Sequence, residues 1–268
     1  MIVKTKIKKD KPAGNSRNYT APALEKGLEI LELLASARKP MTLAQISQEL
    51  GRSKSELYRM LAVLEKKEYL AREEGSDFFH ITNRLFDLGM SVPPIGTLVE
   101  AAFPVMHELA GVTLQPCHLA VASGYRIVVI ARVESPSNLG LSVRVGHSLN
   151  LFETGSGHIL LAWMPPAQKT AAYRHFEKNC ENFSGGPSDD ELETIRRRRY
   201  ARLKSALVQS VEDLSCPVFL GEREHVIASL TMPYLKSRSV EVGADKALQS
   251  LREAAAQLSS LAGTYGGF

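Results

Sequence analysis

Polar and basic residues follow Gly51 at a spacing that suits contacts with a nucleic acid. Serine, lysine and tyrosine side chains can hydrogen-bond to phosphates or base edges, and an arginine can bind guanine or a phosphate through two parallel hydrogen bonds. These residues fall on the first two turns of one predicted helix: Ser53, Lys54, Ser55, Tyr58 and Arg59. A helix that enters the major groove of DNA does so with its N-terminal residues foremost, so the pattern favours a DNA-reading helix.

Other polar and basic positions extend this predicted DNA-binding surface. Lys66 and Lys67 come at the end of the same helix and Arg72 on the next predicted strand, where each can meet a backbone phosphate. Thr42, which opens the preceding helix, completes the predicted DNA-binding set. Glu56 would repel a phosphate, but as a helix-capping residue it can fold back onto its own helix end.

The surrounding sequence predicts the elements that hold this helix. Leucines recur at helical spacing over 21–35, and two segments with the form of a capping box mark helix starts at Thr42 and Ser53. Strands are predicted over 70–72 and 78–81, around a turn. The order helix, helix, turn, helix, hairpin is that of a winged helix-turn-helix. The alternatives are a plain helical hairpin with a solvated face and a module that binds another protein.

The remaining chain predicts a second domain of strands and helices, which indicates an α+β fold with an antiparallel sheet. Strands are predicted over 118–122, 126–134, 139–145, 216–220 and 225–232. Helices are predicted over 98–110, 155–164, 165–180, 188–204 and 240–262. The predicted organisation is a basic disordered tail over 1–20, a DNA-binding domain over 21–90, a linker over 91–97 at a proline pair, and a second domain over 98–268.

Charge and cysteine content narrow the class of protein. The formal net charge is +4, and the first twenty residues alone carry six Lys or Arg against one Asp, so this tail can attract phosphates without regard to sequence. Three scattered cysteines argue against a disulfide framework or a zinc site, and no metal or other cofactor is expected. No apolar run reaches the roughly 18 residues of a membrane span, and no secretory signal is expected. We expect a cytoplasmic protein.

Gly155-Ser156-Gly157 is the most suggestive motif of the second domain. It lacks the spacing of a nucleophile elbow, the Lys of a phosphate-binding P-loop and the third glycine of a dinucleotide fingerprint. A Gly-Ser-Gly turn that opens a helix does offer free backbone N–H groups to a small carboxylate. The alternative is a turn that needs glycine for close packing. An enzyme would need a nucleophile and a base near Ser156 or His158, as in a hydrolase with an appended helix-turn-helix.

The chain resembles the IclR-type bacterial transcriptional regulators over about residues 21–265. The resemblance rests on the order and spacing of blocks such as "TLAQISQELGRSKSELYRMLAVLEKKEYL", "GHSLNLFETGSGHILLAWMP" and "REHVIASLTMPYL". It implies a winged-helix DNA-binding domain, a ligand-sensing domain similar to a GAF domain, and homodimers or tetramers that bind palindromic operators. It does not imply an enzyme.

The resemblance also implies an effector pocket, with a small organic acid as the expected ligand. The family's glycine turn supplies backbone amides, and its late strands supply polar side chains. The positions that correspond to this pocket are Gly155, Ser156, Leu203, Asp213, Ser229 and Thr231, and two of them depart from the family's pattern. Leu203 stands where the family often has an acidic residue, and Asp213 stands where it often has cysteine. The pocket chemistry is therefore expected to differ from that of other members.

Removing residues 1–20 should mainly reduce the salt dependence of DNA binding, because the tail carries an excess of positive charge. The measurement is the slope of log affinity against log salt for the full chain and the shortened chain. Loss of operator preference with an unchanged slope would contradict this assignment.

Overall fold

The computed structural model describes residues 20–265, apart from positions 74, 92–94, 138–139, 142, 181–182, 184, 206–207, 222–224 and 237–241. All of the expected basic tail except Thr20 lies outside the described residues. The chain divides into two compact units, with the division at residue 93, and each is described by itself. None of the described helices is, taken singly, both long enough and apolar enough to cross a membrane.

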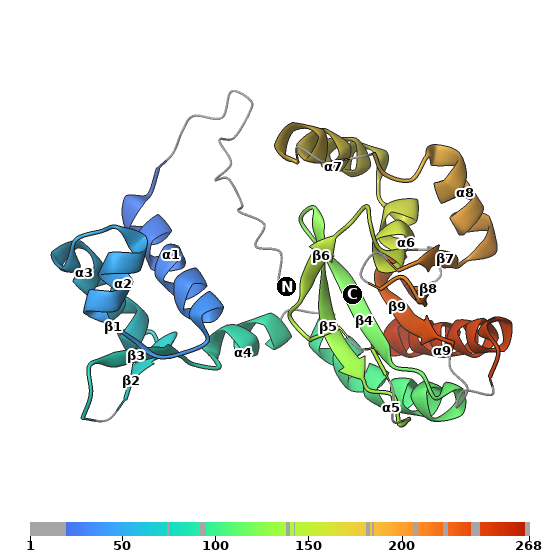
Figure 1. Cartoon of the computed structure of the whole chain (residues 1–268), viewed down its shortest axis with the longest axis horizontal. Coiled ribbons are helices and arrows are strands. Elements are labelled where there is room, and N and C mark those ends of the chain that lie inside the picture. Colours follow the sequence, from blue (N-terminus) through green and yellow to red (C-terminus); the bar gives the residue numbers. More distant parts are fainter. Residues whose placement is uncertain are drawn as a thin grey trace. The chain divides into compact units, whose positions relative to one another are not determined.

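The first unit is a winged helix-turn-helix, as the sequence predicts (Figure 1). Its elements are α1 (Pro22–Ala37), β1 (Met41–Thr42), α2 (Leu43–Leu50), α3 (Lys54–Lys66), β2 (Leu70–Arg72), β3 (Phe78–Ile81) and α4 (Arg84–Ser91). The three strands form an antiparallel sheet in the order β1-β3-β2. The two-residue strand β1 was not predicted, because so short a segment carries no alternating pattern.

Local signals in the sequence account for the ends of α2 and α3. Thr42 caps α2 and forms the complete capping box with Gln45. Gly51 ends α2 in the left-handed conformation, with φ of 63°, which glycine adopts without strain. Ser53 accepts a hydrogen bond from the backbone N–H of Glu56 and so caps α3. Buried aliphatic side chains from α1, α2 and α3, with Leu70 and Phe79 of the wing, then fill one core.

The second unit is an α+β domain built on a six-stranded sheet. Its elements are α5 (Ile95–Thr113), β4 (Cys117–Ser123), β5 (Arg126–Val133), β6 (Ser148–Asn150), α6 (Gly155–Trp163), α7 (Pro166–Asn179), α8 (Asp189–Arg198), β7 (Ala201–Lys204), β8 (Val211–Leu220), β9 (His225–Leu235) and α9 (Ala244–Tyr265). The strand order is β6-β5-β4-β9-β8-β7, with antiparallel neighbours throughout.

The two faces of this sheet are covered by different helices. The long helices α5 and α9 pack against each other and against one face (Figure 1). On this face, the Cys117 thiol bonds to the Met106 carbonyl of α5, and the Phe219 N–H donates to Ser259 of α9. On the opposite face, α6 packs against β7, β8 and β9. Strand side chains alternate between the faces, so α6 meets every second residue of each strand.

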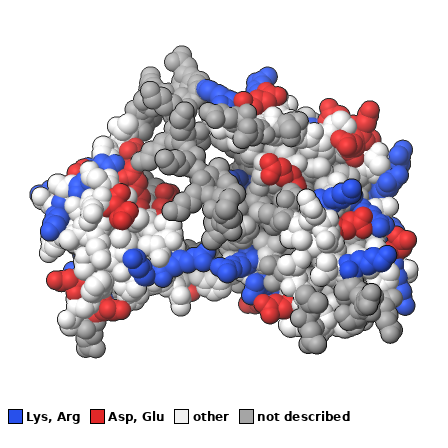
Figure 2. Space-filling view, in the orientation of Figure 1, with Lys and Arg blue, Asp and Glu red and all other residues white. Residues whose placement is uncertain are grey.

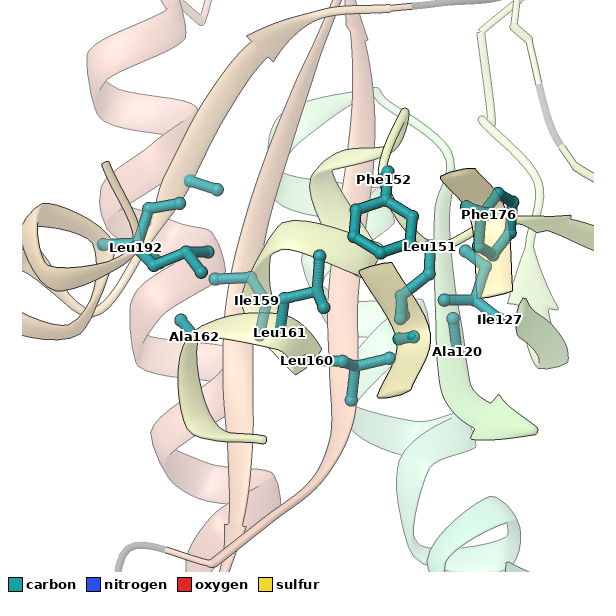
Figure 3. Packing of buried hydrophobic residues seen from close by; sticks show 13 residues of the cluster. Ala120, Ile127, Leu151, Phe152, Ile159, Leu160, Leu161, Ala162, Phe176 and Leu192 are labelled. Carbon is teal, nitrogen blue, oxygen red and sulfur yellow. The ribbon is translucent and has the colours of Figure 1, made fainter. Parts of the chain in front are cut away.

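The layer that contains α6 has its own apolar core (Figure 3). In the close-up, Ile159, Leu160 and Leu161 of α6 lie between Leu192 of α8 on one side and Phe152 on the other. The Phe152 ring makes edge-on contacts with three further aromatic rings, those of Tyr173, Phe176 and Phe183. Such pairs add to the stabilisation by burial, so α7 and α8 hold α6 firmly on the sheet.

Three sequence expectations, two for the second unit and one for the linker, need correction. The described residues of 139–145 do not form a strand, and β6 lies after them at Ser148–Asn150. The helix expected over 188–204 ends at Arg198, where Arg199 turns left-handed at φ 59° and β7 follows. The helix predicted over 155–164 is confirmed as α6, with Gly155, Ser156 and Gly157 in its first turn and Thr154 as its cap. Residues 95–97 of the expected linker lie in α5, whereas 92–94 lie outside the described residues.

The helix start at Gly157 should tolerate no side chain. A Cβ on Gly157 would lie 1.9 Å from the carbonyl oxygen of Leu151, a backbone atom that cannot move alone. We expect Gly157→Ala to lower the free energy of unfolding by about 2–4 kcal/mol, at the upper end of overpacking effects. The measurement is urea unfolding followed by circular dichroism.

Gly111→Ala in α5 is the matched control. A Cβ there meets nothing within 4 Å, so helix propensity alone should raise the free energy of unfolding by about 0.5–1 kcal/mol. Equal stability changes in the two variants would contradict the close contact at Gly157.

Candidate functional site

The N-terminal turns of α3 present a polar and basic surface. Leu57 and Leu61 of α3 are fully buried in the core of the first unit, which turns the opposite side of the helix to solvent. All the positions that the sequence singles out on this helix and its end are exposed: Ser53, Lys54, Ser55, Tyr58, Arg59, Lys66 and Lys67. Tyr58 is 58% exposed, so its ring and hydroxyl are free to contact a partner.

A network of ion pairs neutralises Glu56, an acidic residue on the first turn of α3. Glu56 pairs with Lys26 of α1 and lies 3.6 Å from the Arg52 guanidinium. Arg52 also binds Glu29 of α1 through two hydrogen bonds, of 2.9 and 3.2 Å. The Lys26 hydrogen bond, with help from both cations, lowers the pKa of Glu56. The carboxylate also accepts a hydrogen bond from the backbone of Ser53, so Glu56 folds back onto the start of its own helix, as expected, and in addition joins α3 to α1.

Two predicted DNA-binding residues have partners within the protein. The Arg72 guanidinium lies 3.3 Å from Glu65, 3.9 Å from Asp77 and 4.7 Å from the centre of the Phe79 ring. A phosphate would have to compete with these neighbours for it. The Thr42 hydroxyl accepts the Gln45 N–H as a helix cap, which leaves it little freedom to rotate towards a partner.

Sequence reasoning passed over one exposed position on α3. Val63 is 56% exposed although it is aliphatic. An apolar side chain on a DNA-reading helix can contact the methyl group of thymine. Figure 2 shows Lys and Arg side chains along the margin of the first unit where α3 lies, whereas both signs of charge are interspersed over the visible face of the second unit.

A cavity of about 120 Å³ lies in the second unit, between the N-terminus of α6 and the sheet. This is several times the ~30 Å³ that one water molecule takes in the liquid, so the cavity suits a small molecule. Aliphatic side chains such as Ile127 and Leu149 form most of its wall. Six polar residues also line it: His118, Thr154, Ser156, Ser205, Asp213 and Thr231. None of the described residues that line it is Lys or Arg.

A chain of hydroxyl groups ties α6 to the strands beneath the cavity. Ser156 and Thr231 are hydrogen-bonded at 2.7 Å, Thr231 donates to Ser215 at 2.8 Å, and Ser229 lies 3.3 Å from Thr231. All four residues are buried. Thr154 caps the helix by accepting the Gly157 N–H at 3.1 Å. The N–H groups of Gly155 and Ser156 are in the first turn of α6, where a helix has no internal acceptor for them.

The expected effector residues differ in how they relate to this cavity. Ser156, Asp213 and Thr231 line it, and Ser229 lies behind them in the hydroxyl chain. A Cβ on Gly155 would lie 2.5 Å from the Ser215 hydroxyl, so glycine lets α6 approach β8. Leu203 pairs with Asp213 across β7 and β8 but is absent from the described cavity wall.

Four polar residues of this region were not predicted: His118, Thr154, Ser205 and Ser215. The sequence gives no sign that β4, which carries His118, runs beside a cavity, or that the helix cap Thr154 borders it. Ser205 lies just beyond β7, where a helix was expected, so its position beside Asp213 could not be foreseen. Ser215 falls in the part of β8 before residue 216, where the strand was predicted to start. A correct strand assignment would have brought out both serines.

Burial lowers the pKa of one titratable group of the cavity, His118, and raises the pKa of the other, Asp213. Desolvation lowers the pKa of His118 to about 4, and its Nδ1 atom has no hydrogen-bond partner in the described part of the protein. Desolvation also raises the pKa of Asp213 to about 6, against a hydrogen bond from Ser205 that lowers it. A buried polar atom without a partner is uncommon in native proteins, so His118 indicates a position where a ligand or water binds.

The other residues considered for chemistry are occupied. Ser156 bonds to Thr231, and the His158 ring Nε2 bonds to the Phe152 carbonyl at 2.8 Å, so these two do not form a nucleophile–base pair. Among the residues that the structure describes, no three or more His, Cys, Asp or Glu side chains are placed to hold a metal ion. A larger groove of about 820 Å³ between β8 and α9 is open to solvent and lies on the opposite face of the sheet.

Comparison with protein families matches both units. Residues 23–74 match the IclR helix-turn-helix domain, and residues 96–260 match the C-terminal domain of IclR bacterial transcriptional regulators. The regulator KdgR of Dickeya chrysanthemi is 26% identical over 240 residues, which cover 88% of this chain and 78% of that protein. KdgR of Escherichia coli K12 is also 26% identical over 240 residues, with 88% and 90% covered.

Solved structures share the fold. An IclR transcriptional regulator from Alicyclobacillus acidocaldarius has a TM-score of 0.71 and 22% identity, and covers 91% of this chain and 100% of its own. An IclR homologue from Microbacterium hydrocarbonoxydans, solved in complex with 4-hydroxybenzoate, has a TM-score of 0.73 and 19% identity, with 90% and 98% covered.

The opposite pKa shifts of His118 and Asp213 predict opposite effects of pH on stability. Between about pH 4 and 6.5, His118 binds a proton in the unfolded chain but not in the folded one, so it makes the free energy of unfolding rise with pH. Between about pH 3.8 and 6, Asp213 keeps its proton only in the folded chain, so it makes that free energy fall as pH rises. The two effects oppose each other between about pH 4 and 6.

Single variants should expose each effect in turn. Relative to the unmodified protein, Asp213→Asn should make the free energy of unfolding rise more steeply with pH, and His118→Leu should make it fall, each by up to about 1.4 kcal/mol per pH unit. The measurement is urea unfolding at several pH values, with the double variant as control. The same pH slope in all four proteins would show that neither group is shifted.

Proposed function

The chain belongs to the IclR family of bacterial transcriptional regulators, and we propose that it binds a palindromic DNA operator through α3 under the control of a small organic acid. The acid would occupy the cavity beside α6. The observation that carries the proposal is the exposed polar and basic surface of α3 on a folded winged helix-turn-helix. A location in the cytoplasm, where genomic DNA is accessible, follows from this function.

The contacts of α3 divide into those that read bases and those that position the helix. Arg59 and Tyr58, on the second turn of α3, are the side chains that we assign to base edges. Ser53, Lys54 and Ser55 at the helix start, and Lys66 and Lys67 at its end, suit backbone phosphates. The pairing of Glu56 with Lys26 supports this arrangement, because it offsets the negative charge nearest the DNA.

A homodimer, or a tetramer built from such dimers, is the proposed assembly. It is supported by exposed apolar side chains on two helices of the first unit, Leu24 and Leu28 of α1 and Phe86 of α4, which are 63%, 50% and 64% exposed. Leu24 and Leu28 are one turn apart on α1, and neighbouring exposed apolar side chains of this kind can mark a protein interface. Two copies of α3 related by a two-fold axis would enter successive major grooves about 34 Å apart and read an inverted repeat.

A small organic acid is the proposed effector. The first-turn N–H groups of α6 and its helix dipole favour an anion at the cavity, although no cation lines the described wall. The structural neighbour from Microbacterium hydrocarbonoxydans binds such an acid, 4-hydroxybenzoate. Binding would alter DNA affinity by the ratio of effector affinities for the DNA-bound and DNA-free proteins.

Arg59→Ala tests the assignment of α3 to DNA reading. We expect specific binding to weaken by about 1–3 kcal/mol, with less discrimination between the operator and unrelated DNA, because a base contact is lost. The measurement is equilibrium binding to both DNAs at one physiological salt concentration. The matched control is Arg174→Ala, at an exposed arginine of α7 in the second unit, which should bind as the unmodified protein does.

Two other outcomes have definite meanings. An equal loss on every DNA would assign Arg59 to a phosphate instead of a base. Unchanged binding in the Arg59 variant, with the protein folded, would contradict the proposal that α3 reads DNA.

A further inference from the structure

The polar groups of the cavity beside α6 consist mainly of hydrogen-bond acceptors. Thr231 has one hydroxyl proton and donates it to Ser215. Ser156 must therefore donate its own proton to Thr231 across the 2.7 Å contact, which leaves only lone pairs of Ser156 to face the cavity. Ser205 bonds to the Asp213 carboxylate, which accepts hydrogen bonds and, when ionised, donates none.

The buried Nδ1 atom of His118 lacks a partner in the described chain, and the half-buried Asp213 carboxylate has a hydrogen bond from Ser205. A carboxylate has about four acceptor positions, and no Lys or Arg is among the described residues around the cavity. The Nδ1 atom of His118 is buried and has no partner in the described chain, and the residue is 5% exposed. Leaving such groups without hydrogen bonds is unfavourable, so a ligand that supplies them gains affinity.

Backbone donors lie beside the cavity at the start of α6, where Ser156 lines the wall. The backbone N–H groups of Gly155 and Ser156 are at the N-terminus of α6, where the helix dipole also favours negative charge. The nine-residue helix is held there by the Thr154 cap and the Ser156–Thr231 hydrogen bond. The cavity thus has a donor end for an anion and an acceptor region around Asp213.

We propose that the effector is a small hydroxy acid, whose carboxylate binds at the N-terminus of α6 and whose hydroxyl binds Asp213 and His118. A hydroxyl can donate its proton to Asp213 and, through its lone pairs, accept a hydrogen bond from His118 with Nδ1 protonated. An ammonium group has no lone pair and could serve His118 in one tautomer only. The inference rests on the proposed sensor function and specifies its ligand.

The test compares acids that differ by one group. Calorimetric titration of the full-length protein would use propionate, butyrate and benzoate as parents. Their hydroxylated forms are lactate, 3- and 4-hydroxybutyrate, and the three monohydroxybenzoates, which place the hydroxyl at increasing distances from the carboxylate. Alanine represents the ammonium form. We expect at least one hydroxy acid to bind about 5- to 100-fold more tightly than its parent, because the parent leaves buried acceptors unpaired.

Substitutions assign that preference to named side chains. Asp213→Leu should reduce the preference for the hydroxy acid to within about threefold, and His118→Leu should reduce it in part. Glu212→Gln is the control, because Glu212 precedes Asp213 on β8 but its carboxylate pairs with Arg202 at 2.9 Å. Circular dichroism and DNA binding would show that each variant is folded.

Each alternative result overturns the inference in a recognisable way. Equal affinities of parents and hydroxy acids would leave the sensor function intact and remove the role of the hydroxyl. Tighter binding of alanine than of lactate would assign the partner of Asp213 to a cation. Binding of none of these acids, with DNA binding retained, would remove both this inference and the proposed organic-acid effector.

Discussion

The close packing of α6 against the sheet determines the shape and the polar groups of the cavity in the second unit. The first turn of the helix approaches β8 so closely that a Cβ on Gly155 would overlap the Ser215 hydroxyl, and one on Gly157 would overlap the Leu151 carbonyl. Thr154 fixes the start of the helix, and the Ser156–Thr231 hydrogen bond fixes its rotation. The first turn of α6 thereby borders a cavity to which strands contribute the polar side chains of His118, Asp213 and Thr231. The Gly-Ser-Gly motif can therefore serve two purposes at once, since its glycines allow close packing and its helix N-terminus can bind an anion.

In the first unit, electrostatics set a comparable constraint. A helix that approaches DNA tolerates an acidic residue poorly, yet Glu56 lies on the first turns of α3. Lys26 and Arg52 hold its carboxylate and lower its pKa. Since Arg52 also binds Glu29 of α1, the same network fixes the start of α3 against α1. The acid thus supports the orientation of the helix and does not oppose its function.

The sequence predicted those features that depend on neighbouring residues. The capping box at Thr42, the glycine end of α2 and the wing strands follow local rules and were correct. The segment 188–204 misled because a helix pattern continued past Arg198, where a left-handed residue redirects the chain into β7. The hydrogen bonds around the cavity join residues as far apart as Ser156 and Thr231, and His118 enters it only through the pairing of β4 with β9. Contacts between residues so far apart in the chain cannot be predicted from the local pattern of a single sequence.

The central claim is that this chain binds a specific DNA site and that occupation of its cavity changes that binding. The most direct measurement is a gel-shift titration of the full-length protein on the DNA upstream of its own gene, with excess nonspecific competitor at physiological salt. It would be run with and without the hydroxy acids. The account predicts a discrete, competitor-resistant complex whose affinity changes when one of these acids is added. A folded protein that forms no such complex in any of these conditions would contradict it.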